Sequence, residues 1–142
     1  MLRRWLRRLL KGFAVLALVV LVAAGGLVAW AWAPDQPAEA LMARWGAPPS
    51  RIEPILDLPL HLRDVGPRDD PTPIVLLHGT GDSLHTWQGW AESLTPTRRV
   101  IRYDLPGFGL TGPDPDHDYS MKRQVAVLVA VLDRLGVERA IV

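Results

Sequence analysis

Residues 73–83 read PIVLLHGTGDS, in which four consecutive apolar residues lead into a loop that contains two glycines. A short apolar run between a proline and a glycine is typical of a strand buried on both faces, as in the centre of a parallel sheet. Residues 99–109 read RVIRYDLPGFG and repeat the arrangement. The two stretches predict strands over Ile74–Leu77 and Val100–Tyr103, each followed by a loop that turns at glycine.

Helical patterns separate and follow these strands. Apolar residues recur at helical spacing over Trp87–Leu94, and Pro96 marks the end of that pattern. Ser120 is a good N-cap for a second helix that reaches Leu135, and Ala140–Val142 begins another apolar strand. Strands that alternate with helices predict an α/β fold with a mostly parallel sheet covered on both sides.

A different pattern precedes the first buried strand. Between Leu56 and Arg63, leucines alternate with Asp57, Pro59, His61 and Arg63. A period of two is the pattern of a half-buried strand. Proline cannot donate to a central ladder, so Pro59 predicts an edge strand or a turn between two short strands.

The N-terminus carries a basic segment, residues 1–11, followed by an uncharged apolar run, residues 12–33. As a helix that run would be about 33 Å long, enough to cross the hydrocarbon core of a lipid bilayer. The charges before it are positive, and the first charges after it are Asp35 and Glu39. The positive-inside rule therefore predicts a single-pass transmembrane anchor. Its N-terminus would be cytoplasmic, and residue 34 onward would be periplasmic or extracellular.

A cleaved signal peptide is the alternative. Residues 29–31 and 31–33 both place tryptophan between two alanines, which fits the small-x-small pattern of a cleavage site. The apolar run, however, exceeds the about 7–15 residues of a signal core. Pro34 would also hinder cleavage directly before it, because its ring resists the extended conformation that a protease needs. These features favour an uncleaved anchor.

The remaining organisation follows from proline density and composition. Five prolines over residues 34–54 predict a linker that joins the anchor to a partial α/β domain over residues 55–142. The chain has no cysteine, which excludes disulfides, thiolate nucleophiles and cysteine zinc sites. The net charge is +1 and the basic residues gather at the N-terminus, so nucleic acid is not predicted as a partner.

No cofactor or metal is predicted. Leu84 stands where a dinucleotide-binding fingerprint would have its third glycine. The series Asp114, Asp116 and Asp118 lacks the glycine and the glutamate of a calcium loop, so it is interpreted as a solvated turn. His78 and His85 do not have the spacing of a helical zinc pair.

The order of an apolar strand, His-Gly-Thr-Gly at residues 78–81, Trp87 in the next helix and Asp-Leu-Pro-Gly-Phe-Gly at residues 104–109 resembles the α/β-hydrolases that carry a helical cap. The resemblance extends over Ile52–Val142. It implies that the chain holds the N-terminal half of that fold.

The resemblance also implies roles in the two loops. The backbone N–H of Thr80 would donate to a developing oxyanion, and Gly81 would leave room for substrate. Phe108 and Leu110 would line a substrate pocket or pack under a cap. The residues expected to shape the loops are His78, Gly79, Gly81, Asp104, Gly107 and Gly109.

The catalytic triad is not expected within the sequence. No Gly-x-Ser-x-Gly occurs, and in this family the acid and the histidine follow the nucleophile. Ser83 lies near the first loop but has no identified base. The chain is therefore expected to be an inactive N-terminal fragment of a membrane-anchored serine hydrolase that acts on a small-molecule ester or acyl substrate. Thr80-Gly81 favours the serine branch, because dehalogenases and epoxide hydrolases usually carry proline or an acidic residue there. The alternative is a complete, non-catalytic membrane-anchored module or pseudo-enzyme.

Overall fold

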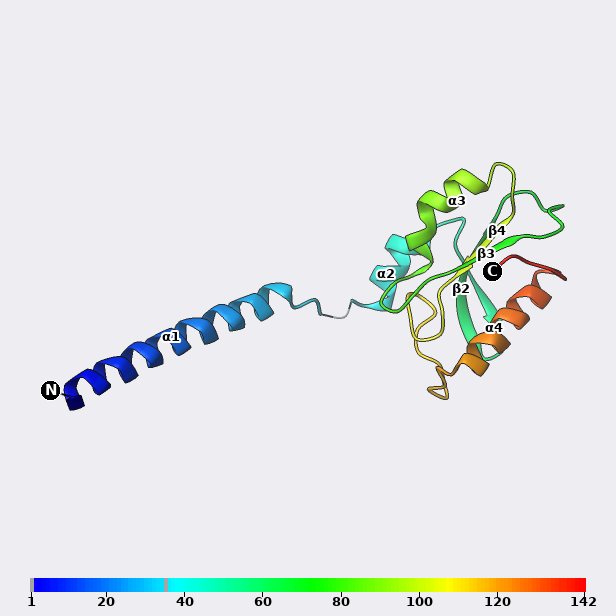
Figure 1. Cartoon of the computed structure of the whole chain (residues 1–142). Helices are drawn as coiled ribbons and strands as arrows, with labels where there is room; N and C mark the ends of the chain where they lie inside the picture. Colours follow the sequence, from blue (N-terminus) through cyan, green and yellow to red (C-terminus); the bar gives the residue numbers. More distant parts are fainter. Residues whose placement is uncertain (1, 35) are drawn as a thin grey trace. The chain divides into compact units, whose positions relative to one another are not determined.

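The computed structural model describes residues 2–34 and 36–142 (Figure 1). Contacts divide the chain into two compact units, Met1–Gln36 and Pro37–Val142. The first unit is dominated by one helix, and the second contains the sheet.

The first unit contains helix α1, Leu2–Ala31, which joins the basic segment and the apolar run without a break. Nearly all of its described side chains are exposed. The part Arg3–Ala31 is long and apolar enough to cross a membrane, although a signal sequence would share both properties. The helix is therefore a candidate membrane span.

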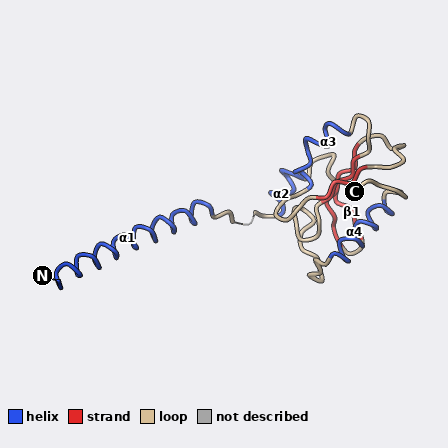
Figure 2. Tube along the Cα trace, in the orientation of Figure 1, coloured by secondary structure: helices blue, strands red, loops and turns tan. Residues whose placement is uncertain are grey.

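The second unit alternates strands and helices (Figures 1 and 2). Two strands have the predicted bounds, β3 at Ile74–Leu77 and β4 at Val100–Tyr103. The other elements are α2 (Ala38–Trp45), β1 (Arg51–Ile55), β2 (Leu58–Val65), the 3₁₀-helix η1 (Leu84–Trp87), α3 (Gln88–Leu94) and α4 (Met121–Arg134). Helix α2 and all of strand β1 except Ile55 lie within the stretch, residues 34–54, that the sequence analysis assigned to a linker.

The sheet is mixed, with strand order β1-β2-β4-β3. Strands β3 and β4 are parallel, as expected for strands joined by a helical crossover. Strands β1 and β2 are joined by the turn Leu56–Asp57 and pair antiparallel, and β2 also pairs antiparallel with β4. The described residues thus contain the hairpin side of the sheet, which is why parallel pairs do not predominate. Pro59 lies within β2 opposite Pro54 of β1.

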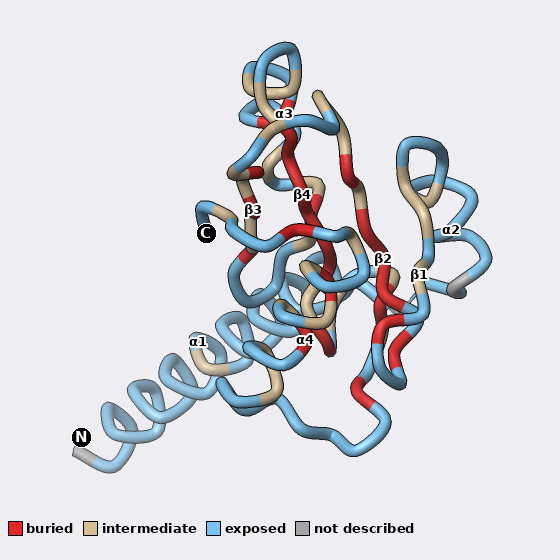
Figure 3. The backbone as a smooth tube through the Cα atoms, turned by 90° about the vertical axis from the view of Figure 1, so that its right-hand side faces the viewer, coloured by how far each residue is buried: buried red, intermediate tan, exposed pale blue. Residues whose placement is uncertain are grey.

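Both faces of the sheet are covered. Ile101 and Tyr103 of β4 pack in one core with Val127 and Val131 of α4. On the other face, Arg102 Nη1 donates to the Leu84 carbonyl at 3.3 Å, so the opposite side chains of β4 face η1. Figure 3 shows that burial concentrates in the central strands. Because β3 and β4 are paired in parallel, their carboxyl ends lie side by side at one edge of the sheet.

The segment before α4 departs from the solvated turn of the sequence analysis. Asp114 is only 1% exposed. Its carboxylate accepts from the backbone N–H groups of Asp116 and Asp118 at 3.0 and 3.2 Å, and from Arg123 Nε at 2.8 Å. Burial is tolerated because these donors replace water around the charge. The predicted N-cap is confirmed, since Ser120 Oγ accepts from the Arg123 N–H at 3.2 Å.

Residues 140–142 contribute one parallel bridge, between Ile74 and Ile141. The Val75 N–H donates to the Ile141 carbonyl at 2.7 Å, and the Ile141 N–H donates to the Pro73 carbonyl at 2.9 Å. This apolar segment therefore lies beside β3, on the side away from β4.

Candidate functional site

The loop after β3 forms a tight turn at the carboxyl end of the sheet. The Asp82 N–H donates to the Gly79 carbonyl at 3.3 Å, which places Thr80 and Gly81 at the two central positions. Gly81 has a φ of 78°, and a positive φ at the third turn residue is the requirement of a type II turn. Thr80 is exposed, and its N–H donates to no acceptor in the described part of the chain. An N–H without an internal acceptor, on an exposed residue at the carboxyl edge of a sheet, can donate to a ligand.

His78 joins this loop to the loop after β4. The ring is 4% exposed. Its Nε2 accepts from the Leu105 N–H at 3.0 Å, which leaves Nδ1 as the N–H that donates to the Gly79 carbonyl at 2.8 Å. The ring also stands edge-on to Phe108, with centroids 5.5 Å apart. One imidazole thereby fixes the spacing of the two loops.

Asp104 is the second connection between the loops. Its Oδ1 accepts from the Leu84 N–H at 2.7 Å, and its Oδ2 accepts from the Leu110 N–H at 2.8 Å and from His61 Nδ1 at 2.7 Å. Burial alone would raise the pKa of Asp104, but the hydrogen bonds from His61 and from the two N–H groups outweigh it and hold the pKa below its usual value. The carboxylate stays ionised and acts as a fixed acceptor.

Gly109 is required by this arrangement. Its φ is 51°, in the left-handed region, and a Cβ at this position would overlap the Asp104 carboxylate. Any other residue would therefore meet both backbone strain and a steric clash. The glycine lets the loop wrap around the charge.

A cavity of about 490 Å³ opens beside Thr80. Gly79, Thr80 and Phe108 form part of its wall, and α4 contributes Gln124. The Gln124 Oε1 atom is buried and has no hydrogen-bond partner among the residues that the structure describes. The cavity therefore combines Thr80, whose N–H has no acceptor in the described residues, with the aromatic wall of Phe108, whereas the Gln124 oxygen is not accessible from it. Sequence reasoning missed Gln124, because a single glutamine within an apolar helix carries no functional signal.

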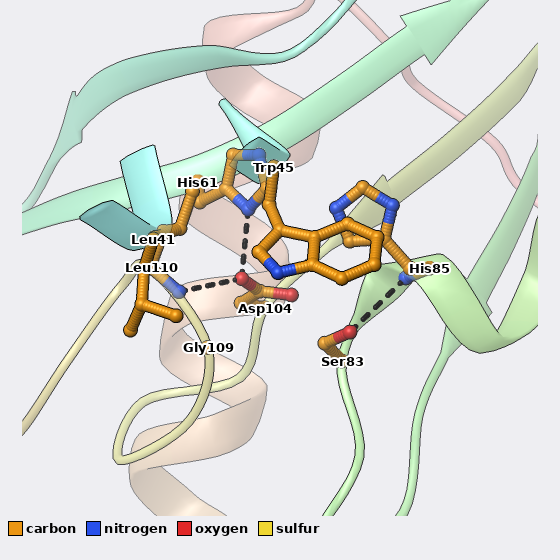
Figure 4. A pocket seen from close by; sticks show the side chains of 8 residues that line it. All are labelled: Leu41, Trp45, His61, Ser83, His85, Asp104, Gly109 and Leu110. Carbon is orange, nitrogen blue, oxygen red and sulfur yellow. Dashed lines mark hydrogen bonds and ion pairs between the residues drawn. The ribbon is translucent and has the colours of Figure 1, made fainter. Parts of the chain in front are cut away.

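Phe108 and Leu110 do not share a pocket. Leu110 lines a different cavity, of about 180 Å³, together with Trp45, His61 and His85 (Figure 4). The residues of the loop after β4 are thus divided between two cavities. The sequence alone predicted that both residues line a substrate pocket or pack under a cap, because it does not reveal which way the loop turns.

His61 departs from the alternation expected in its strand. The ring is fully buried, although its neighbours in β2 suggested a polar face. Its Nδ1 bonds Asp104, and its backbone N–H donates to Thr111 Oγ1 at 3.0 Å. The hydrogen bond to Asp104, whose carboxylate also accepts from two backbone N–H groups, stabilises the buried position of the His61 imidazole. No sequence pattern indicated this pair, since its members lie 43 residues apart.

Ser50, His61 and Asp104 form a hydrogen-bonded series with the residue types of a catalytic triad. His61 Nε2 lies 2.9 Å from Ser50 Oγ. The same oxygen accepts from Arg63 Nε at 2.7 Å and lies 3.2 Å from the Trp45 carbonyl, to which its hydroxyl can donate. Arg63 Nε occupies one lone pair of the hydroxyl, and the single proton of the hydroxyl can go either to His61 Nε2 or to the Trp45 carbonyl. The series fastens the end of α2 to β2 and to the loop after β4.

Comparisons with known proteins agree with this architecture. A sequence model of the alpha/beta hydrolase fold matches residues 72–142, half of the chain. The 2-hydroxy-6-oxo-2,4-heptadienoate hydrolase of Pseudomonas putida is 37% identical over 82 residues, covering 56% of this chain and 29% of that protein. A haloalkane dehalogenase of Mesorhizobium japonicum is 36% identical over 91 residues, covering 64% of this chain and 28% of that protein.

Solved structures show the same likeness. The meta-cleavage product hydrolase CumD from Pseudomonas fluorescens has a TM-score of 0.55 and 29% identity, with 64% of this chain and 33% of that chain covered. The haloalkane dehalogenase DbeA from Bradyrhizobium elkani has a TM-score of 0.54 and 30% identity, with 61% and 29% covered. The chain spans less than a third of the length of these curated relatives. The family model covers β3, β4 and both loops described above, and the chain belongs to the alpha/beta hydrolase fold family.

Proposed function

We propose that this chain supplies the oxyanion side of a membrane-anchored serine hydrolase that acts on a carbonyl substrate of ester or acyl type. The observation that carries the proposal is Thr80 itself: the residue is exposed and lines a 490 Å³ cavity, and its N–H donates to no acceptor in the described residues. The sequence has no Gly-x-Ser-x-Gly, so the proposal requires the native protein to carry the nucleophile, acid and base outside these 142 residues.

In the proposed reaction a serine attacks the substrate carbonyl and a histidine takes its proton. Negative charge then develops on the carbonyl oxygen, where the Thr80 N–H donates to it. His78 and Asp104 hold the turn in place, so the donor needs no rearrangement when the charge appears. The relatives support a hydrolytic reaction, and the first of them is named for an oxo acid substrate. Haloalkane dehalogenases are also among them, so the serine nucleophile rests on Thr80-Gly81 alone.

The proposed location is a single-pass anchor, with α1 in the bilayer, Met1 in the cytoplasm and the second unit in the periplasm or outside the cell. The support is the length and composition of α1 and the positive charges at its N-terminal end. Extraction of membranes with carbonate would leave an anchored protein in the pellet. A protein released by this treatment, with an N-terminus after residue 31, would instead identify α1 as a cleaved signal sequence.

The experiment that tests the oxyanion role compares Thr80→Pro with Thr80→Ala in the native protein. Proline is favoured at the second position of a type II turn, so Thr80→Pro retains the turn and removes only the N–H. We expect kcat to fall about 10²–10³-fold with proline and to change little with alanine, because alanine keeps the backbone donor. Equal activity of the two variants would refute the role. Absence of any hydrolytic activity in the native protein would favour a pseudo-enzyme.

A further inference from the structure

The first turns of α1 carry their charges on one face. Helix α1 runs without a break from Leu2 to Ala31, so residues 3–11 are helical (Figure 1). At about 3.6 residues per turn, the five cations of this stretch fall within an arc of about 140° around the helix axis. These cations are Arg3, Arg4, Arg7, Arg8 and Lys11. The opposite arc holds the apolar residues Trp5, Leu6, Leu9 and Leu10. The positive-inside rule counts positive charges and not their arrangement around a helix, so this separation is additional to the signal for orientation.

The cationic face, which is the name we give to these five side chains, has no counter-charge in the described part of the chain. None of its members forms an ion pair within residues 2–34 and 36–142. The sequence also holds no Asp or Glu before Asp35. Cations four residues apart on a helix, such as Arg4 and Arg8, have Cβ atoms about 5–6 Å apart and repel each other. An anion that lies between two of them removes this repulsion, so the face is suited to an anionic ligand.

The depth of the cationic face follows from the length of the apolar part of α1. Residues 12–31 form a helix about 30 Å long, which equals the thickness of the hydrocarbon core. If these residues fill the core, the Cα atom of Lys11 lies about 1.5 Å outside it, and those of Arg8 and Arg7 lie about 6 Å and about 7.5 Å outside it. The headgroup layer extends about 5–8 Å beyond the core, so these three residues lie at the level of the phosphates. Arg3 and Arg4 lie about 12–14 Å outside the core, beyond that layer.

The apolar side of the same turns favours a lipid surface over an acidic protein. Trp5 and Leu9 are 64% and 52% exposed. A helix with one cationic face and one apolar face binds at an anionic membrane surface, where the cations meet phosphates and the apolar side chains meet the upper part of the acyl chains. An acidic protein would pair with the cations but would leave the tryptophan and the leucines exposed. An anionic phospholipid satisfies both faces.

We infer that the first turns of α1 form a binding site for anionic phospholipids, in which Arg7, Arg8 and Lys11 bind headgroup phosphates and Trp5 and Leu9 pack against acyl chains. A neutral phospholipid also carries a phosphate, but its positive amine is repelled by the cationic face, so the site prefers a headgroup with net negative charge. The inference rests on the proposed location of α1 in a bilayer and adds the class of lipid that surrounds its N-terminal end.

The test measures which lipid gathers around the basic end of α1. The chain has no cysteine, so Leu10→Cys introduces a single thiol for an NBD fluorophore on the apolar side, about 3 Å outside the core. The labelled full chain is reconstituted into vesicles of equal parts phosphatidylglycerol and phosphatidylcholine. In one sample a small share of the phosphatidylglycerol carries a nitroxide near the top of an acyl chain, and in the other sample the phosphatidylcholine does. Nitroxide quenches the fluorophore at close range, so the two quenching values give the ratio of the two lipids around the label.

We expect phosphatidylglycerol to be enriched about fivefold over phosphatidylcholine around the labelled chain, the effect of one basic side chain at an anionic surface. Arg7→Gln combined with Arg8→Gln should lower the enrichment below about twofold. Arg3→Gln combined with Arg4→Gln is the matched control, because it removes the same charge from the same face beyond the headgroup layer, and it should keep the enrichment above about threefold. Each double variant retains the other three cations of the face. Vesicles with the same lipids in both leaflets make the orientation of the helix irrelevant.

Retention of the chain in phosphatidylcholine vesicles after a carbonate wash is measured first. A chain that this wash releases refutes the anchor, and the inference with it. A chain that is retained but is quenched equally by the two lipids refutes the lipid site alone and leaves the cations as an orientation signal. Equal losses of enrichment in the two double variants would also overturn the inference, because the preference would then follow net charge and not the depth of Arg7 and Arg8.

Discussion

Replacing Asp104 with asparagine should destabilise the second unit severely while preserving the shape of the side chain. The Asp104 carboxylate accepts three hydrogen bonds, one at Oδ1 and two at Oδ2. Asparagine has one carbonyl oxygen. If that oxygen takes the place of Oδ2, the amide NH₂ faces the Leu84 N–H, and two donors oppose each other.

The magnitude follows from these contacts. Loss of one hydrogen bond to a charged acceptor costs about 1.5–3 kcal/mol, and Leu84 is fully buried, so water cannot replace the acceptor. The two remaining bonds lose their charge assistance, which roughly doubles the strength of a hydrogen bond. The sum is about 3–5 kcal/mol, a large share of the about 5–15 kcal/mol that stabilises a typical domain.

Urea unfolding in nanodiscs at pH 7, followed by tryptophan fluorescence, measures this loss. With a slope of about 1–3 kcal/mol per molar urea, the midpoint should fall by about 1–5 M. Asp116→Asn is the matched control, because Asp116 is exposed in the neighbouring segment and should change stability by less than about 0.5 kcal/mol. A loss below about 1 kcal/mol in Asp104→Asn would refute the role of the carboxylate as the link between the loops.

The pH dependence has a definite sign. The pKa of Asp104 is lowered in the folded state. Its contribution to the free energy of unfolding is therefore complete above the unfolded pKa of about 3.9 and is lost as the pH falls through the folded-state pKa. The difference between wild type and Asp104→Asn should therefore be constant near neutrality and shrink below about pH 4. A difference that stays the same at pH 3 would contradict this assignment.

Three further predictions concern other positions. Gly109→Ala should destabilise the chain in urea by at least about 2 kcal/mol more than Gly112→Ala, because both residues have positive φ but only at Gly109 would a Cβ meet the enclosed carboxylate; equal losses would mean that the loop moves aside. Tyr103→Phe should be neutral or stabilising by about 1 kcal/mol in the same assay, because the Tyr103 hydroxyl is buried without a partner among the described residues, and a clear loss would reveal a hidden partner. Asp70 should titrate at about 2 by ¹³C NMR, because the hydrogen bond from Arg98 is the largest cause that lowers its pKa. Arg98→Gln should move the titration midpoint toward about 3.9, and an unchanged midpoint would assign the lowered pKa to the backbone donors.

Local patterns predicted the elements well where several signals coincided. Ile74–Leu77 is an uninterrupted apolar run, and Val100–Tyr103 is apolar or aromatic except for Arg102; both end at clear breakers, and both are strands with these bounds. Ser120 has both the residue type and the position of an N-cap, and its side chain caps α4. The sheet proved more antiparallel than expected, because pairing partners depend on connections that periodicity does not encode.

The site residues show the limit more sharply. His78 and Asp104 could be predicted as site residues because each directly follows a predicted strand. Nothing in the strand pattern distinguished His61 from the polar residues that alternate with leucine on either side of it. Its burial is decided by a carboxylate 43 residues away. The division of the loop after β4 between two cavities likewise depends on backbone conformations at glycine, which a single sequence does not reveal.

The central claim is that this chain forms part of a membrane-anchored serine hydrolase. The most direct measurement treats native membranes with a fluorophosphonate probe, captures the protein with an antibody against residues 60–140, and determines probe incorporation and intact mass together. The account predicts a labelled membrane protein heavier than the 15.7 kDa of this sequence, with the probe on a serine outside residues 1–142. A captured protein of 15.7 kDa that carries no label would contradict it.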